Sequence, residues 1–297
     1  MLTSKYGFPA AIFYSALAVG AVPAFASDAA SDDTGAVEGS AASDYSTSEI
    51  QTTQSLAPSG PALERAGEPI DEATASDLGA ESGFSLSANI AFASEYRFRG
   101  VDLSGGEFAV QGGFDLSHTS GFYVGTWASN LDEQTVGYGS TELDVYGGWS
   151  SNVADGIGVD VGVIGYLYPD AGPGEFDYVE FYGSVSGSLG PASVTGGIAY
   201  APDQDSLGGT DNLYLYTDAS VGIPDTPVTI NGHLGYTDGF LTFTDDSEAF
   251  DWSLGAAVAV GPLTVSGAYV GVEGDQAFDP GGVFTDDALV FTVSASF

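Results

Sequence analysis

The segment EYRFRG holds the side chains of this chain that are best suited to act on a charged solute. In a β-strand, Glu95, Arg97 and Arg99 would share one face, because successive side chains point to opposite sides. The chain has only 4 Lys and Arg against 41 Asp and Glu, a net charge of -37. In a water-filled passage these guanidinium groups would orient and select polar solutes by charge. Alternatively, they pair with neighbours such as Glu95, Glu142 or Asp144 and fix the wall, since unpaired buried charge is costly.

Carboxylates recur along the later strands at positions that face the same way as the two arginines. They alternate with apolar residues, as expected where one face is hydrated and the other is not. On the solvent face of a soluble sheet the same pattern would arise, so the pattern alone does not decide. The predicted pore-lining set is Glu95, Arg97, Arg99, Asp115, Glu142, Asp144, Asp160, Glu180, Asp218 and Asp251.

Catalysis is not predicted. The only histidines are His118, expected to cap a turn, and His233, expected to hydrogen-bond on an inward face. Neither has a motif with a nucleophile and an orienting acid beside it, so an enzyme in the wall is only a third alternative. The absence of Cys excludes disulfides, thiolate chemistry and Cys-built metal sites. We predict no cofactor.

Two acidic loop segments carry the oxygen ligands that Ca²⁺ or Mg²⁺ prefer. They could hold divalent ions loosely or bridge through them to lipopolysaccharide phosphates. Neither has the spacing of an EF-hand, so no dedicated metal site is predicted, and the alternative is a solvated anionic loop. The first segment contains Asp245, Asp246 and Glu248, and the second contains Asp275, Asp279, Asp286 and Asp287.

The N-terminal third has the composition of a signal peptide followed by a linker. Lys5 precedes a mostly apolar run that ends in AFA, which predicts a signal peptide over residues 1–26, cleaved after Ala26. Residues 27–82 are rich in Ala, Ser, Asp and Glu without a sustained period, which predicts a disordered acidic segment. A plug or tether is the functional alternative for that segment. So acidic a chain also excludes nucleic acid as an electrostatically bound partner.

From residue 83 to 297 the hydrophobic period is two, which indicates strands with one apolar and one polar face. Short and longer connections alternate between them, and the longer ones are rich in Asp and Gly. The predicted strands are 84–98, 107–117, 121–129, 140–149, 157–168, 176–187, 191–201, 211–223, 228–237, 249–260, 263–272 and 286–297.

An even number of strands with such loop asymmetry is typical of an antiparallel up-and-down β-barrel in a bacterial outer membrane. A soluble sandwich is the alternative. The chain ends on an alternating strand at Phe297, a terminal aromatic residue that barrel-insertion machinery would read. Trp149, Trp252 and Tyr96 are among the aromatic residues expected near strand ends on the outer face, where interfacial girdles lie.

The segment from Ala88 to Asp132 resembles a known family. The matching pieces include Ser94, Tyr96 and the stretch FRG, then Gln111 and Gly112, then a cluster from His118 to Asn130. They resemble the proteobacterial TorF family of porins, also called the Gcw_chp family of uncharacterised bacterial proteins. The resemblance implies an outer-membrane barrel with pore activity and supplies no catalytic residue.

The sequence thus predicts a twelve-stranded barrel in the outer membrane of a Gram-negative bacterium, in contact with lipid and lipopolysaccharide. Its expected function is passive diffusion of small polar, mainly cationic, solutes through a narrow channel. The alternative is a closed structural or ligand-binding barrel without conductance, its interior filled by tyrosines such as Tyr166, Tyr178 and Tyr214.

Overall fold

The computed structural model describes residues 76–77, 83–172, 176–242, 244, 246–275 and 284–297. The predicted signal peptide, 1–26, and nearly all of the predicted acidic segment, 27–82, lie outside the described residues. Within the described part, no helix is long and apolar enough to cross a membrane.

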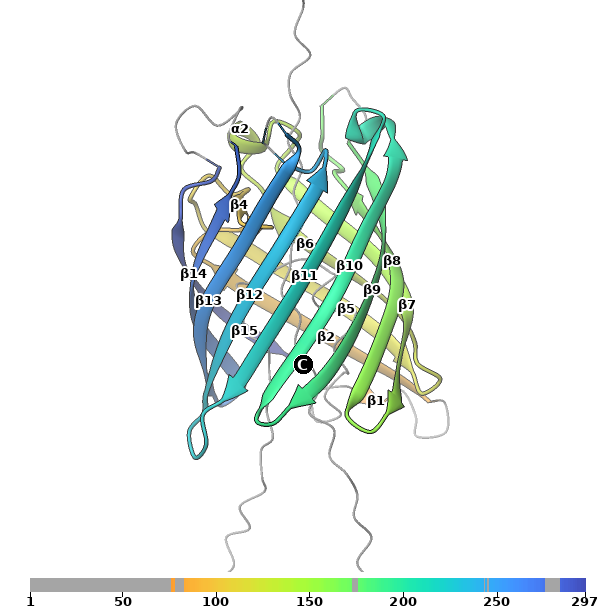
Figure 1. Ribbon diagram of the computed structural model, residues 1–297, viewed down its shortest axis with the longest axis vertical. Helices are drawn as coiled ribbons and strands as arrows, with labels where there is room; N and C mark the ends of the chain where they lie inside the picture. The colour runs from red at the N-terminus through yellow and green to blue at the C-terminus, as the bar shows by residue number, and fades with distance from the viewer. Residues whose placement is uncertain (1–75, 78–82, 173–175, 243, 245, 276–283) are drawn as a thin grey trace, which may run out of the picture.

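Twelve antiparallel strands form one closed barrel (Figure 1). Each strand pairs with the next along the chain, and β15 pairs with β2, with Val293 opposite Phe92, so the sheet has no free edge at that seam. The predicted fold class is therefore confirmed. The strands are β2 (Phe84–Ala93), β5 (Ala109–His118), β6 (Phe122–Asn130), β7 (Thr141–Ala154), β8 (Ile157–Leu167), β9 (Tyr178–Leu189), β10 (Ala192–Gln204), β11 (Thr210–Gly222), β12 (Val228–Gly239), β13 (Glu248–Val260), β14 (Leu263–Glu273) and β15 (Ala288–Ser296).

The structure also contains short elements in addition to the twelve barrel strands. β1 (Ser76–Asp77) adds to β2 outside the ring, and a small hairpin is formed by β3 (Arg97–Phe98) and β4 (Val101–Asp102). Helix α2 (Glu133–Val136) and the 3-10 turn η1 (Asp205–Leu207) lie in connections at one end of the barrel. That end carries the long connections, whereas turns such as 155–156 and 261–262 close the other end.

The outer surface of the barrel is apolar. Residues of alternate strand positions, such as Phe114, Phe181 and Leu254, expose more than half of their side-chain surface, while the intervening positions are buried inside. A soluble monomer rarely exposes so continuous an apolar surface. A barrel that meets lipid requires one, because hydrocarbon replaces water around its wall.

Glycine and tyrosine pair across neighbouring strands on the inner face. Gly197 on β10 lies opposite Tyr216 on β11, and a Cβ added to Gly197 would overlap the ring of that tyrosine. Gly125 is covered in the same way by Tyr146, its partner in the register between β6 and β7. The tyrosine rings thus lie flat against the wall, where only glycine leaves room for them.

This packing predicts a large difference between two adjacent glycines. Gly197→Ala should destabilise the barrel by about 1–3 kcal/mol, because the new methyl group overlaps the ring of Tyr216. Gly196→Ala is the matched control, since a Cβ there meets nothing within 4 Å. Urea unfolding in liposomes compares the two variants. Equal midpoints for both would show that Tyr216 does not rest on Gly197.

The structure corrects one predicted strand. β2 ends at Ala93 and not at residue 98, and the chain from 94 to 108 turns into the barrel. Tyr96, predicted to face outward, is fully buried inside, and so is Phe98, which strand alternation with Arg97 and Arg99 would also place outward. Arg99 and Gly100 both have positive φ angles, 45° and 81°, which reverse the chain into the β3–β4 hairpin instead of extending the strand. Tyr96 therefore takes no part in an interfacial girdle.

Candidate functional site

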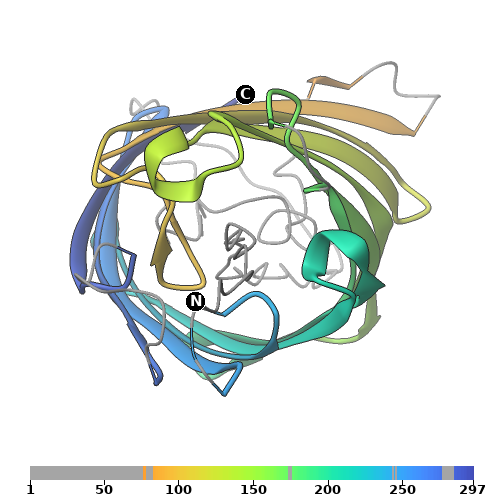
Figure 2. The same cartoon turned by 90° about the horizontal axis from the view of Figure 1, so that it is seen from above.

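The connection 94–108, called here the inward loop, lies within the ring of strands (Figure 2). Hydrogen bonds hold it in shape. The Tyr96 N–H donates to Ser104 Oγ at 2.8 Å, and Asp102 accepts from the N–H groups of Ser104 and Gly106 at 2.9 and 2.6 Å. The Asp132 N–H donates to Leu103 O, which ties the loop to the connection that carries α2.

Arg97 is fixed within and beside the inward loop. Its Nη2 lies 3.0 Å from Glu95 Oε2, and its Nη1 donates to Gly100 O at 3.2 Å and to Asp286 O at 2.7 Å. The pairing of Arg97 with Glu95 is one that the sequence suggested. The guanidinium also links the loop to the connection that precedes β15.

Arg99 reaches the wall of the barrel. Its Nη2 donates to Glu180 Oε1 at 3.0 Å and to Oε2 at 3.1 Å, and both side chains are nearly inaccessible to solvent. The guanidinium carbon lies 4.0 Å from the ring centroid of Tyr214, a cation–π contact. Glu180 is on β9 and Tyr214 on β11, so the loop between β2 and β5 is anchored to strands far along the sheet. Sequence reasoning named Glu95, Glu142 and Asp144 as partners, but missed Glu180 for Arg99.

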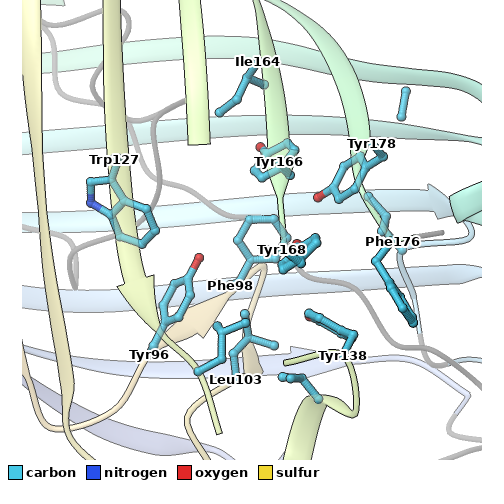
Figure 3. Packing of buried hydrophobic residues seen from close by; sticks show 14 of the residues in the cluster. Tyr96, Phe98, Leu103, Trp127, Tyr138, Ile164, Tyr166, Tyr168, Phe176 and Tyr178 are labelled. Atoms are coloured by element: carbon cyan, nitrogen blue, oxygen red, sulfur yellow. The ribbon is translucent and has the colours of Figure 1, made fainter. Parts of the chain in front are cut away.

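Aromatic side chains surround the tip of the inward loop (Figure 3). Phe98 meets the ring of Tyr166 edge-on with centroids 6.1 Å apart, and Tyr166 stacks on Tyr178 at 4.5 Å. The ring centroids of Tyr96 and Trp127 are 5.6 Å apart. The loop and the aromatic wall pack against each other at this level, which narrows the interior.

Two carboxylates of β7 are buried beside this cluster. Glu142 accepts a hydrogen bond from the Tyr96 hydroxyl at 3.2 Å, and Asp144 lies two residues further along the same inner face. Among the described residues, no hydrogen-bond partner is found for Glu142 Oε2. Both carboxyl groups therefore lie on the inner face next to the inward loop.

A second polar group lies on the inner face of β11 to β13. His233 Nδ1 is 2.7 Å from Asp218 Oδ1, and His233 Nε2 is 2.7 Å from Asp251 Oδ1. The Tyr214 hydroxyl is 2.9 Å from the same Nε2. An imidazole that bonds a carboxylate through each nitrogen must donate from both, so this geometry requires the imidazolium form. His233 is thus a third buried cation, held between two carboxylates.

Toward the end with short turns, tyrosines cover the remaining predicted acids. The Tyr123 hydroxyl donates to Asp160 at 2.7 Å and lies 2.6 Å from the Tyr182 hydroxyl. Tyr146 donates to Asp115. All ten residues of the predicted set are therefore on the inner side of the barrel, seven on strands and three on the inward loop. They form separate groups and not one ring.

The other predicted sites are dispersed. His118 is the last residue of β5, and its Nδ1 is 2.7 Å from Ser120 Oγ in the turn that follows. Asp246 accepts from the Glu248 N–H and Asp287 from the Tyr269 hydroxyl, while Asp245 and Asp279 lie outside the described residues. No group of three or more His, Asp or Glu that could hold a metal ion occurs among the residues the structure places.

At the end with the long connections, the barrel opens into a cavity of about 840 Å³. It lies between the connection after β8 and the turn η1, and three carboxylates contribute to it. Sequence reasoning missed it, because its residues belong to two separate connections that the pairing of β8, β9 and β10 brings together. The cavity is lined by Tyr168, Ala171, Gly172, Phe176, Asp177, Asp203, Gln204, Asp205, Ser206 and Gly209.

Asp170 ties two of the long connections together. Its carboxylate accepts from the hydroxyl and N–H of Ser140 and from the N–H of Thr141, the last two at 3.0 and 3.1 Å. The hydrogen bond from the Ser140 side chain is the main cause that holds the pKa of Asp170 below its ordinary value. The contribution of this carboxylate to stability is therefore present above the unfolded pKa and is lost as the pH falls through the lower folded pKa.

We expect the amides of Ser140 and Thr141 to lose protection against hydrogen exchange in acid, because protonated Asp170 accepts less strongly. Asp170→Asn should show reduced protection already at neutral pH and little further change in acid. Hydrogen exchange with mass spectrometry, corrected for intrinsic exchange rates, measures both. The same acid-dependent loss in Asp170→Asn would assign it to another group.

These features define a class of protein: a closed membrane-type β-barrel with an apolar exterior and a charged, tyrosine-rich interior narrowed by an inward loop. The chain belongs to the Gcw_chp family, described as bacterial proteins of unknown function, whose model matches residues 77–297. The predicted membership of Gcw_chp is thereby confirmed, whereas the TorF name stays a prediction. Among curated proteins, none matches the chain in sequence.

Several solved porins are similar to the chain in shape. A KdgM porin in complex with disordered oligogalacturonate is 8% identical, with a TM-score of 0.48, over 71% of this chain and 98% of that one. OccK5 (OpdH) of Pseudomonas aeruginosa is 13% identical, with a TM-score of 0.41, over 75% of this chain and 69% of that one. OpdQ of the same organism is 13% identical, with a TM-score of 0.39, over 75% of this chain and 67% of that one.

Proposed function

We propose that the protein is an outer-membrane channel for passive diffusion of small polar solutes, with a preference for cations. The observation that carries this proposal is the charge of the interior. Among the described residues, the eight predicted acids and Asp102 lie inside it, against the guanidinium groups of Arg97 and Arg99 and the imidazolium of His233. A narrow passage with excess negative charge concentrates cations and repels anions.

The cavity at the end with the long connections supports the same preference for cations. Asp177, Asp203 and Asp205 line the cavity at the end with long connections, so a cation would meet negative charge before it reached the inward loop. The carboxyl groups of Glu142 and Asp144 follow inside the barrel, beside Tyr96. Arg97 and Arg99 are each bound to a carboxylate, so they modulate the field locally and do not reverse it.

One observation favours a second function, that of a closed structural or ligand-binding barrel. The aromatic cluster at the inward loop is nearly solvent-free, and Tyr96, Tyr166 and Tyr214 are fully buried. Packing that tight could block passage altogether. The two functions differ in conductance and not in fold.

Single-channel recording of the refolded chain in a planar bilayer separates the two functions. The channel proposal expects steady, small unitary currents in the full chain. It also expects them in a chain without residues 27–82, if that segment is a tether, whereas current only after removal would make the segment a plug. Silence in both forms would reject the channel and favour the closed barrel.

A further inference from the structure

Arg99 occupies a cation site that is built by the barrel wall. Glu180 on β9 supplies a fully buried carboxylate, which also accepts from the Tyr166 hydroxyl at 3.2 Å. Tyr214 on β11 supplies an aromatic face at 4.0 Å from the guanidinium carbon. Neither residue belongs to the inward loop, so the site is a property of the wall.

The guanidinium of Arg99 fits this site incompletely. Only Nη2 is hydrogen-bonded, and it is shared between the two oxygens of Glu180. Among the described residues, neither Nε nor Nη1 of Arg99 has an acceptor. The strongest arrangement of a guanidinium with a carboxylate is the fork, in which two N–H groups bond one oxygen each. The inward loop therefore places a guanidinium group in this site, but in an orientation that does not form the two-bond fork with Glu180.

Backbone geometry explains why the pose is imperfect. Arg99 has a φ of 45°, a left-handed conformation that a residue with a Cβ adopts at a cost. The loop is attached to the same chain, so a high effective concentration holds its guanidinium in place despite this cost. A free solute would have neither the advantage of attachment nor the constraint on its orientation.

We propose that the Glu180–Tyr214 site binds solutes that carry a guanidinium group, and that such solutes compete with Arg99 for it. A planar guanidinium can stack on Tyr214 and fork onto Glu180 at once, which a compact ammonium group cannot do. Displacement of Arg99 would release the tip of the inward loop from β9 and β11. The proposal deepens the proposed function, on which its role in passage rests, because it names a class of cation that the barrel would admit.

The test uses binding, so it does not depend on conductance. Ethylguanidinium is titrated by calorimetry into the full chain, refolded in detergent, and ethylammonium serves as the comparison probe. Arg99→Ala removes the tethered guanidinium and leaves Glu180 and Tyr214 in place. Arg97→Ala is the matched control, because it removes the other loop guanidinium, which is bound to Glu95 and not to Glu180.

We expect Arg99→Ala to bind ethylguanidinium at least about tenfold more tightly than the unmodified chain does, and more tightly than it binds ethylammonium. Arg97→Ala should bind like the unmodified chain. Adding Glu180→Gln to Arg99→Ala should abolish the gain. Equal affinities in the unmodified chain, Arg99→Ala and the double variant would overturn the proposal, as would equal affinities of Arg99→Ala for the two probes.

If Arg99→Ala does not fold, Arg99→Lys replaces it, since its point charge competes less well for the fork. Its affinity for ethylguanidinium should then exceed that of the unmodified chain, and an unchanged affinity would overturn the proposal. Binding without any bilayer current would support the site and reject the channel. Current without the affinity gain would reject the site and leave the channel standing.

Discussion

Glu180→Gln is expected to destabilise the folded barrel by about 3–5 kcal/mol, the usual cost of leaving one member of a buried ion pair without its partner. Arg99 is held by Glu180 through a single nitrogen, and both side chains are almost fully buried. With a neutral amide at position 180, the guanidinium keeps the weaker amide oxygen and the aromatic faces of Tyr214 and Phe98. Urea unfolding in liposomes measures the loss.

The double variant Arg99→Gln with Glu180→Gln should recover much of that stability, because no unpaired charge then remains inside. Glu107→Gln is the matched control. It makes the same chemical change at an exposed position of the inward loop and should alter stability little. If Glu180→Gln unfolds at the same urea concentration as Glu107→Gln, the ion pair between Arg99 and Glu180 does not anchor the inward loop.

Shortening the inward loop is expected to raise the single-channel conductance roughly threefold, because pore dimensions limit the flow of ions. Replacing residues 95–107 by a short Gly-Ser turn removes Phe98, the β3–β4 hairpin and both arginines from the interior. β2 and β5 keep their own pairing, since their register runs from Phe84 and His118 to Ala93 and Ala109. The closed sheet should therefore remain.

A matched change at the other end of the barrel serves as the control for that experiment. Replacing the turn 224–227 between β11 and β12 alters a connection of the same sheet that does not enter the interior. Its conductance should equal that of the unmodified chain. An unchanged conductance after shortening the inward loop would mean that the narrowest point lies elsewhere, for example among Tyr123, Tyr182 and Asp160.

The strands of the barrel could be predicted from the sequence because each carries its own signal. An apolar face that meets lipid alternates with a polar inner face, so runs such as Leu289 to Phe297 show the period of two directly. The inner placement of Glu142, Asp144, Glu180, Asp218 and Asp251 follows from the same alternation. Local periodicity therefore determines both the strand and the side to which each residue points.

The inward loop could not be predicted in this way. Glu95 to Arg99 alternate as a strand would, yet Arg99 and Gly100 turn the chain inward, and the partner of Arg99 lies 81 residues away. Such a partner is determined by closure of the barrel, which no local pattern records. The pairing of Gly197 with Tyr216 is similar, since the register between strands decides which glycine a tyrosine covers.

The ion preference of the proposed channel follows from the charged side chains on the inner side of the barrel. Because the carboxyl groups inside the described part of the barrel outnumber its three cations, the permeability to K⁺ should exceed that to Cl⁻. The preference should weaken at high salt, as screening reduces the field of the carboxylates. Glu142→Gln combined with Asp144→Asn should reduce it too, because the double variant removes two carboxyl groups from the inner face.

The reversal potential of the full chain in a planar bilayer under a KCl gradient tests the central claim most directly. We expect a reversal potential displaced toward the K⁺ equilibrium potential, and displaced less in the Glu142→Gln, Asp144→Asn variant. A reversal potential displaced toward the Cl⁻ equilibrium potential would contradict the account, because the arginines and His233, and not the carboxylates, would then determine which ions pass.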